Sequence, residues 1–112
     1  MNMIKFLATT TLIFLFASGT VLAEETVTVV VKDYKFDPEE ITVKVGTTIR
    51  WENQEKGQYH SILFPAMDDK KVDYFFPGDS RERTFDKPGT YPYICEPHIE
   101  SHNMKGVVHV VE

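Results

Sequence analysis

The sequence has a single cysteine, Cys95, which excludes an intramolecular disulfide. Small exported domains usually carry cysteines in pairs that staple the fold. A lone thiol in an oxidising compartment needs protection, and ligation to a metal gives it. The structural alternative is a buried, unreactive cysteine, because free cysteine is among the most buried residue types. The nearby His98 and Met104 favour the metal.

Basic residues are fewer than acidic ones. The chain has 12 lysines and arginines against 17 aspartates and glutamates, a formal net charge of −5. We expect no nucleic-acid partner, because binding to phosphates depends on clustered positive charge. An acidic surface indicates either a basic protein partner or simply good solubility.

A long apolar run is also missing, since the apolar segment at residues 6–17 is too short to be a comfortable membrane span. It follows one basic residue, Lys5, and precedes small and neutral residues that end in Ala23, a pattern typical of secretory signal peptides. We therefore predict a signal peptide over residues 1–23 and export of residues 24–112 to the periplasm. An uncleaved N-terminal anchor is the alternative. After cleavage we expect a monomer with no membrane segment.

The rest of the chain shows neither internal repeats nor an amphipathic helix. Short segments rich in β-branched and apolar residues follow one another instead, and turns containing Gly, Pro, Asn or Asp separate them. These segments are residues 26–32, 41–45, 47–52, 59–64, 81–85, 90–94 and 106–111. Residues 65–80 are irregular, and we expect part of them along a sheet edge. Seven or eight short strands in one small domain predict an all-β fold, a Greek-key β-sandwich.

Potential metal ligands are concentrated in residues 91–104, where Cys95 is followed by His98 and Met104. A thiolate, a neutral imidazole and a thioether are soft or borderline ligands, and they suit copper far better than magnesium or calcium. A site with two imidazoles, one thiolate and a weak axial thioether needs one more histidine. His60 can supply it, because a Greek-key sandwich can place the strand ends at residues 60 and 95 together.

Three stretches carry a resemblance to known proteins. They are ITVKVGTTIRWEN at 41–53, DKPGTYPYICEPH at 86–98 and MKGVVHVVE at 104–112. Together with a valine-rich opening strand and His60, they make the chain similar to the cupredoxins, and among these to the amicyanin, plastocyanin and pseudoazurin group. Cys-x-x-His is a weak signal by itself, but this combination is specific and covers essentially the whole mature chain.

The resemblance implies a type 1 copper site. By position, His60 and His98 would be the imidazole ligands, Cys95 the thiolate and Met104 the weak axial thioether. It also implies a diffusible electron carrier rather than an enzyme, one that moves single electrons between redox proteins such as a cytochrome or a dehydrogenase. The solvent-side edge of His98 would then be the port for electrons.

Some details of this site stay open. Five residues separate His98 from Met104, more than we expect for an amicyanin, and one of them is His102. His102 could replace Met104 and give a more tetragonal, red or green copper centre, although a surface position is the commoner fate of such a residue. Two supporting hydrogen bonds are expected, one from the Ser61 N–H to the thiolate and one from Asn53 to the copper loop. Asn53 could equally be an ordinary turn residue.

Two other functions remain compatible with these ligands. One is periplasmic copper handling or tolerance, but the mature chain has just two methionines and no histidine-rich tract. The other is a small copper enzyme, which needs an open coordination position that Met104 would fill. For the electron carrier, Pro65, Pro97 and Ile99 are the expected apolar docking rim around His98.

Overall fold

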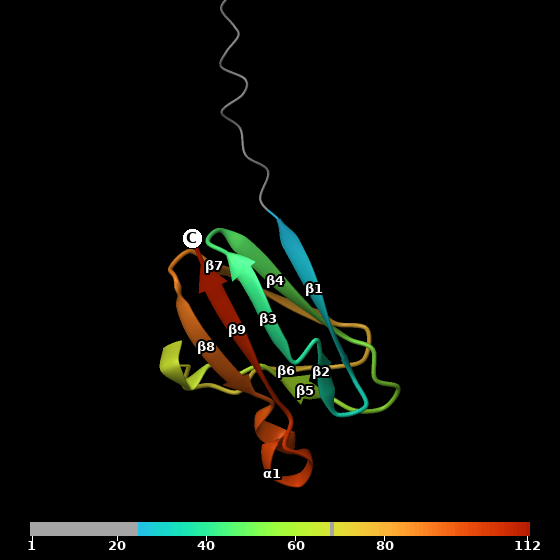
Figure 1. The fold of residues 1–112 in the computed structure, drawn as a ribbon. Helices are drawn as coiled ribbons and strands as arrows, with labels where there is room; N and C mark the ends of the chain where they lie inside the picture. The colour runs from blue at the N-terminus through green and yellow to red at the C-terminus, as the bar shows by residue number, and fades with distance from the viewer. Residues whose placement is uncertain (1–24, 68) are drawn as a thin grey trace, which may run out of the picture.

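A computed structural model describes residues 25–67 and 69–112, so the predicted signal peptide at 1–23 lies outside the described residues. The described chain forms two facing sheets (Figure 1). The first has the order β2-β1-β4-β7 and consists of β1 (Thr26–Lys32), β2 (Lys35–Asp37), β4 (Thr47–Asn53) and β7 (Ser80–Phe85). The second has the order β3-β9-β8 and consists of β3 (Glu40–Lys44), β8 (Gly89–Ile94) and β9 (Lys105–Val111).

Neighbours within each sheet are often distant in the sequence. β1 runs parallel to β4 and β3 runs parallel to β9, whereas the other strand pairs are antiparallel. The chain crosses between the sheets from β2 to β3, from β3 to β4 and from β7 to β8, as Greek-key connections require. The predicted β-sandwich is confirmed. The described residues form nine strands rather than seven or eight, because the short strands β2 and β6 carry no alternation long enough to recognise.

The core lies between the two sheets and follows the period of two. Val29 and Val31 on β1 and Ile49 and Trp51 on β4 are buried on the inner face. The second sheet contributes Tyr93, whose ring packs edge-on against Trp51 with centroids 5.4 Å apart. Because neighbouring residues of a strand point to opposite faces, alternation determines which residues share a face, and packing of the two sheets buries that face.

One end of the sandwich is built from short elements. β5 (His60–Ser61) pairs with β6 (Tyr74–Phe75), and the 3-10 helices η3 (Pro65–Met67) and η4 (Glu96–His98) and the helical turn α1 (Ile99–His102) complete it. In Figure 1, α1 lies at the end of the molecule opposite the C-terminus. Among the described residues, no helix has the length and apolar character needed to cross a bilayer.

The segments before and after Pro65 differ in part from the prediction. Of the strand expected at 59–64, only β5 and a single bridge from Leu63 to Ile94 form. Within residues 65–80, η3 and β6 are regular, and β6 extends β5 rather than either large sheet. Asp68 lies outside the described residues. This irregular stretch therefore packs beside the segment that carries His60.

Candidate metal centre

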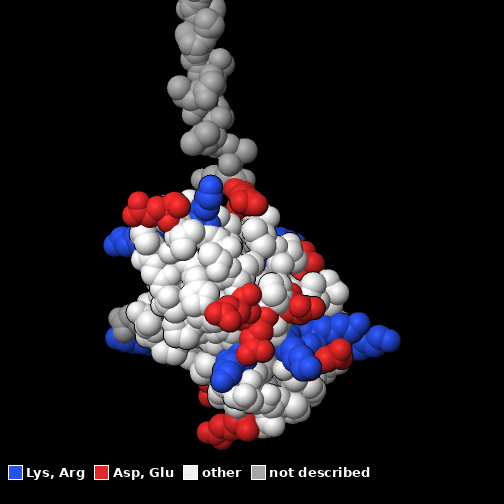
Figure 2. All heavy atoms as spheres, in the orientation of Figure 1, with Lys and Arg blue, Asp and Glu red and all other residues white. Residues whose placement is uncertain are grey.

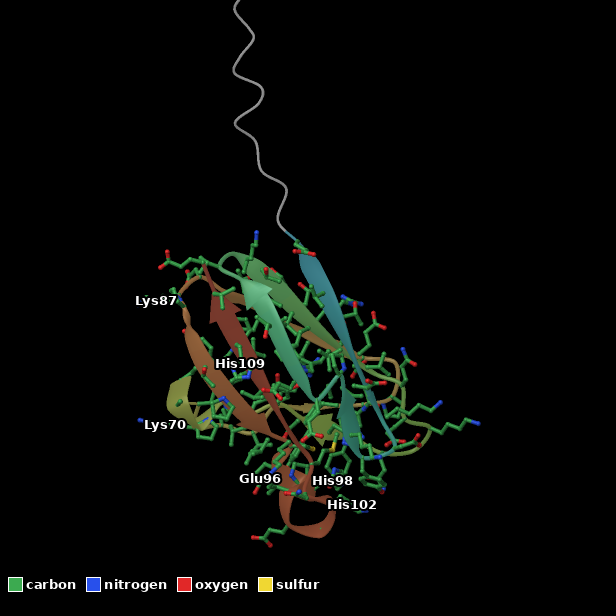
Figure 3. All side chains as sticks on the ribbon, in the orientation of Figure 1. Lys70, Lys87, Glu96, His98, His102 and His109 are labelled. Carbon is green, nitrogen blue, oxygen red and sulfur yellow. The ribbon has the colours of Figure 1, made fainter. Side chains whose placement is uncertain are left out.

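Two chain segments meet at this end of the sandwich. His60 begins β5, and Cys95 follows the last residue of β8. The two segments are joined by a pair of backbone hydrogen bonds, in which the Leu63 N–H donates to the Ile94 carbonyl (2.9 Å) and the Ile94 N–H donates to the Leu63 carbonyl (3.0 Å). The expected juxtaposition of His60 and Cys95 is confirmed, and His98 joins them from η4. Figure 3 labels His98 at this end of the molecule.

The three side chains converge on one point. The Cys95 Sγ lies 3.6 Å from the His60 Nδ1 and 3.4 Å from the His98 Nδ1. Among residues 25–67 and 69–112, these three are the group whose ligand atoms all lie within 4.8 Å of one another. Ligands about 2.1 and 2.3 Å from a shared ion are roughly 3.6 Å apart at a tetrahedral angle. The separations therefore fit a first-row metal ion held by all three.

Burial shifts the pKa values of the three donor side chains. His60 and Cys95 are fully buried, and His98 is 9% exposed. Burial lowers the pKa of His60, which Glu55 partly opposes, and burial also lowers the pKa of His98. Both imidazoles are therefore neutral at neutral pH, with a lone pair available for a metal. Burial raises the pKa of the Cys95 thiol, so this residue needs a bound cation to become a thiolate.

Ser61 makes the contact with the thiol that the sequence predicts. Its backbone N–H points at the Cys95 Sγ at 3.4 Å, and this hydrogen bond opposes the burial effect on the thiol pKa. The Ser61 hydroxyl accepts a second hydrogen bond from the Glu96 N–H at 3.0 Å. Ser61 therefore fixes the cysteine loop to β5 through its backbone and its side chain.

Met104 lies at the other end of that loop. Its carbonyl accepts a hydrogen bond from the Cys95 N–H (3.0 Å), and its own N–H donates to the His98 carbonyl (3.4 Å). The side chain is 1% exposed and belongs to the core cluster that includes Cys95. These bonds close residues 95–104 into a compact loop with a buried thioether.

His102 lies outside the group of converging donors, although its ring stands edge-on to that of His98 with centroids 5.9 Å apart. Its side chain is exposed, and its ring stacks on Tyr34 with centroids 3.7 Å apart and 4° between the planes. Its Nδ1 lies 2.7 Å from the Ser101 hydroxyl, and it does not belong to the metal-ligating group. This geometry favours Met104 over His102 as the fourth ligand.

Asn53 has different partners from those expected. Its amide donates to the carbonyls of Gln58 (3.1 Å) and Phe75 (3.0 Å), and its Oδ1 accepts from the Glu55 N–H (2.9 Å). These bonds hold residues 54–58 against β6 rather than against residues 95–104. The predicted hydrogen bond from Asn53 to the copper loop is therefore wrong. Asn53 instead supports the segment that leads to His60.

Sequence reasoning missed two residues around the imidazoles. A carboxylate oxygen of Glu55 lies 3.3 Å from the His60 Nε2 and also accepts the Tyr34 N–H at 2.9 Å. The Tyr34 ring stands edge-on to His60 and to His98, with centroids 5.9 and 4.9 Å away. Glu55 is one of several polar residues in its loop, so no local signal separates it from its neighbours.

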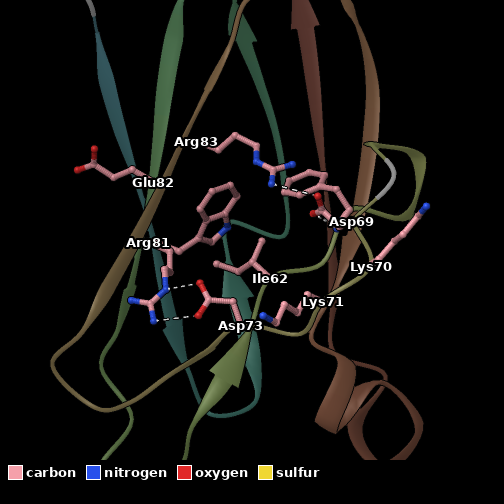
Figure 4. A pocket seen from close by; sticks show the side chains of 10 residues that line it. Ile62, Asp69, Lys70, Lys71, Asp73, Arg81, Glu82 and Arg83 are labelled. Atoms are coloured by element: carbon pink, nitrogen blue, oxygen red, sulfur yellow. Dashed lines mark hydrogen bonds and ion pairs between the residues drawn. The ribbon is translucent and has the colours of Figure 1, made fainter.

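A separate hollow of about 310 Å³ lies over Trp51 and Ile62 (Figure 4). Charged side chains line it, and both of its arginines are engaged in ion pairs, Arg81 with Asp73 (2.8 Å) and Arg83 with Asp69 (3.2 Å). The guanidinium groups of the hollow therefore already have carboxylate partners. The three converging donors remain the centre with recognisable chemistry.

Comparison with known proteins agrees with this geometry. A plastocyanin from Scenedesmus fuscus is 38% identical over 85 residues, which is 67% of this chain and 85% of the relative. The solved structure of a reduced amicyanin variant superposes with a TM-score of 0.67 at 30% identity, covering 85% of this chain and 90% of amicyanin.

An enzyme is also among the structural neighbours. A copper-containing nitrite reductase from Thermus scotoductus has a TM-score of 0.68 at 27% identity, but the match covers 81% of this chain and only 23% of the reductase. A family model described as the cupredoxin-like domain matches residues 5–110. Since that match spans nearly the whole sequence and the fold and the converging donors agree with it, the chain belongs to the cupredoxin-like family.

Proposed function

We propose that this protein is a single-electron carrier that holds one copper ion through His60, Cys95, His98 and Met104. The observation that carries the proposal is the placement of two imidazole Nδ1 atoms at 3.6 and 3.4 Å from one buried thiol. Copper bound there supplies a one-electron couple between Cu(I) and Cu(II). The same donors also bind zinc, so the identity of the metal has to be tested.

The protein around these donors supports electron transfer because it is fixed in place. His60 is held by the backbone pairing of Leu63 with Ile94, and the loop from Cys95 to Met104 is closed by its own backbone bonds. A rigid frame of two imidazoles and a thiolate with a weak thioether is a compromise between the preferences of Cu(I) and Cu(II). Little of this chain then has to move when the charge of the site changes.

Deep burial argues for a carrier of electrons over a carrier of copper. A protein that hands over copper has to expose its ligands to a partner, whereas here His60, Cys95 and Met104 are at most 1% exposed. A buried thioether on the fourth side also leaves no evident open position for a substrate, which argues against an enzyme.

The compartment is part of the proposal. We infer that residues 1–23 are a signal peptide and that residues 24–112 act as a monomer in the periplasm. Some of the plastocyanin relatives are described as chloroplastic. In an exported compartment, full burial would protect the single thiol from oxidants.

The first test is addition of Cu(II) to the apoprotein. We expect one equivalent to give an intense visible band from sulfur-to-copper charge transfer, a reductant to bleach it, and an oxidant to restore it. Met104→Leu should shift the band. It should also raise the reduction potential, because loss of even a weak electron donor destabilises Cu(II) more than Cu(I). The measurements are visible and electron paramagnetic resonance spectra and voltammetry.

The matched variant in this test is His102→Ala, which removes an imidazole that lies outside the group of converging donors. We expect its visible band to stay where it is in the unsubstituted protein. A spectrum that responds to His102→Ala and ignores Met104→Leu would contradict the ligand set. Copper that leaves within seconds to a competing chelator would instead favour copper handling over electron transfer.

Aromatic side chains near His98 offer a docking surface beside the rim of Pro65, Pro97 and Ile99 that the sequence predicts. Three aromatic side chains, Tyr59, Tyr74 and Phe76, are 40 to 54% exposed, and the Tyr59 ring contacts those of Tyr74 and Phe76 with centroids 5.0 and 5.8 Å apart. The Tyr59 ring also lies 6.1 Å from that of His98. Of the expected rim, Pro65 is exposed, whereas Pro97 and Ile99 are only partly exposed. We propose this aromatic patch, together with the edge of His98, as the contact for a redox partner.

The partner that fits this patch is a redox protein with a basic surface around its own exposed cofactor edge. The net charge of −5 favours such a protein in diffusional encounter at low ionic strength. Figure 2 shows acidic and basic side chains interspersed on the visible face, so the charge on that face is not gathered into one patch. The aromatic patch would therefore provide the contact and the net charge the long-range attraction.

The docking proposal predicts a loss that is specific to protein partners. Phe76→Ser should slow oxidation of the reduced protein by a basic c-type cytochrome about three- to tenfold, because exposed aromatic anchors contribute most of the energy of such interfaces. Oxidation by hexacyanoferrate should not change, since a small ion needs no apolar patch. The measurement is stopped-flow kinetics at low ionic strength.

Val45→Ser is the control for the docking test, because Val45 is also exposed but follows β3 at the opposite end of the sandwich. Equal rates with the cytochrome for Phe76→Ser and the unsubstituted protein would exclude the aromatic patch as the docking site. A parallel slowing with hexacyanoferrate would show that the substitution had damaged the copper centre itself.

A further inference from the structure

The closest ring contact around the metal centre is between Tyr34 and His102. The rings are parallel within 4° and their centroids are 3.7 Å apart. His102 is the last residue of α1, and Tyr34 lies in the two-residue turn that joins β1 to β2. The stack therefore connects the loop of residues 95–104 to a hairpin turn on the first sheet.

Tyr34 has an uncommon backbone for an aromatic residue. Asp33 and Tyr34 have φ angles of 55° and 58°, the left-handed values that a two-residue hairpin turn requires. Non-glycine residues rarely adopt this conformation, and bulky ones less often still. Strain of this kind persists only where the surrounding structure holds it, which makes the position a candidate for a specific role.

The same tyrosine reaches both sides of the metal centre. Its N–H donates to the Glu55 carboxylate that lies against the His60 Nε2. Its ring stands edge-on to His98 at 86°, with centroids 4.9 Å apart, while one of its faces carries His102. Tyr34 thus contacts His98, is connected to His60 by two hydrogen bonds through the Glu55 carboxylate, and stacks on His102 in the loop that carries the remaining donors.

His102 is well placed to act on that loop. α1 is a single helical turn, and it ends where Asn103 adopts φ 52° and its N–H donates to the Ile99 carbonyl at 3.0 Å. A helix of four residues has little stability of its own, so its position depends on contacts with the rest of the protein. Among the described aromatic contacts, those of His102 are with Tyr34 and His98.

We propose that the Tyr34–His102 stack is a clamp that holds the loop of residues 95–104 closed over the metal centre and slows release of the metal. The proposal rests on the proposed copper site and assigns His102 a positioning role rather than a ligand role. For the ion to leave, the loop has to move away from β5, and this movement separates the two rings. The stack is lost in the open state, so it lengthens the lifetime of the closed one.

The test is a double-mutant cycle on copper release. Cu(I) is removed by a colorimetric chelator at concentrations where the rate no longer depends on the chelator, so that dissociation from the protein is measured. We expect His102→Ala and Tyr34→Ala each to release copper about two- to tenfold faster, the range expected for one aromatic pair. The double variant should be no faster than the faster single variant, because the second substitution has no stack left to remove.

Two further variants separate stacking from other effects. His102→Phe keeps a flat ring at the same position and should release copper as slowly as the unsubstituted protein. His109→Ala removes a histidine from β9 whose partners are Thr90 and Glu40, far from the loop in Figure 3, and should change nothing. A change of less than twofold in His102→Ala, or release as fast in His102→Phe as in His102→Ala, would overturn the clamp.

A second readout needs no metal. In the apoprotein, His102→Ala should increase amide hydrogen exchange at Asn103, whose N–H closes α1, while His102→Phe should preserve its protection. If the unsubstituted protein failed to bind copper, the proposed function would fail and this exchange would still test the clamp. If copper bound tightly but exchange at Asn103 were the same in all variants, the clamp alone would be excluded.

Discussion

Cys95→Ser is expected to abolish the visible band of the copper form completely and to weaken copper binding by orders of magnitude. Sulfur-to-copper charge transfer requires the thiolate, and a serine hydroxyl does not ionise at neutral pH in a buried site. The residue is fully buried and lies within 3.6 Å of both imidazole Nδ1 atoms, so no other described sulfur takes the same place. Absorption spectroscopy and copper titration measure the two effects.

Cys95→Ser should also change the number of protons that are released when copper binds. Because burial raises the pKa of the thiol and lowers those of His60 and His98, copper binding at pH 7.5 should release about one proton, which comes from Cys95. Below the lowered pKa values of the histidines, additional protons must leave and the affinity should fall. Calorimetry in buffers with different ionisation enthalpies measures this release, which Cys95→Ser should remove.

Met67→Leu is the matched control, because it removes a sulfur whose partner is Arg83, at 3.2 Å, outside the donor group. We expect its spectrum and its proton release to equal those of the unsubstituted protein. A Cys95→Ser protein that kept the visible band would exclude Cys95 as a ligand. Circular dichroism of the apoproteins checks that both variants are folded.

The fold was predictable because its signals are local. Alternation places Val27, Val29 and Val31 on one face of the first strand and Ile49 with Trp51 on one face of another, and all of these except the partly buried Val27 lie in the core. The convergence of His60 with Cys95 involves residues distant in the sequence, and it was expected only because both lie at strand ends and because the chain resembles cupredoxins. Ser61 followed from that pairing, since it is next to His60 in β5 and its N–H donates to the sulfur.

The surroundings of the imidazoles were not predictable from one sequence. The contact of Glu55 with His60 depends on how residues 54–58 fold back, which Asn53 determines through bonds to Gln58 and Phe75. The position of His102 depends on the helical turn that Asn103 ends and on the unusual backbone of Tyr34. These conformations result from tertiary contacts, and no spacing or alternation in the sequence encodes them.

Glu55→Ala is expected to weaken copper binding about 10- to 100-fold, the usual cost of removing a partner that orients a metal-binding histidine. The His60 Nδ1 faces the thiol, so its Nε2 carries the proton and donates to the Glu55 carboxylate at 3.3 Å. This bond fixes the tautomer and makes the imidazole a stronger donor. Competition titration against a chelator of known affinity measures the change.

Glu55→Gln separates the hydrogen bond from the charge. The amide oxygen can still accept from His60 and from the Tyr34 N–H, so copper affinity should fall less than in Glu55→Ala. The negative charge is lost, however, and because the Glu55 side chain is only 13% exposed, water screens that charge incompletely. A carboxylate beside the site stabilises Cu(II) over Cu(I), so Glu55→Gln should raise the reduction potential.

Glu82→Gln is the control, because it removes a carboxylate from an exposed ion pair with Arg50 on the first sheet. Its potential should stay close to that of the unsubstituted protein, since the surrounding water screens exposed charges. Equal shifts of the reduction potential in Glu55→Gln and Glu82→Gln would show that the effect depends only on the overall charge of the protein. Unchanged copper affinity in Glu55→Ala would show that packing alone, through Tyr34 and the segment held by Asn53, is sufficient to orient the His60 ring.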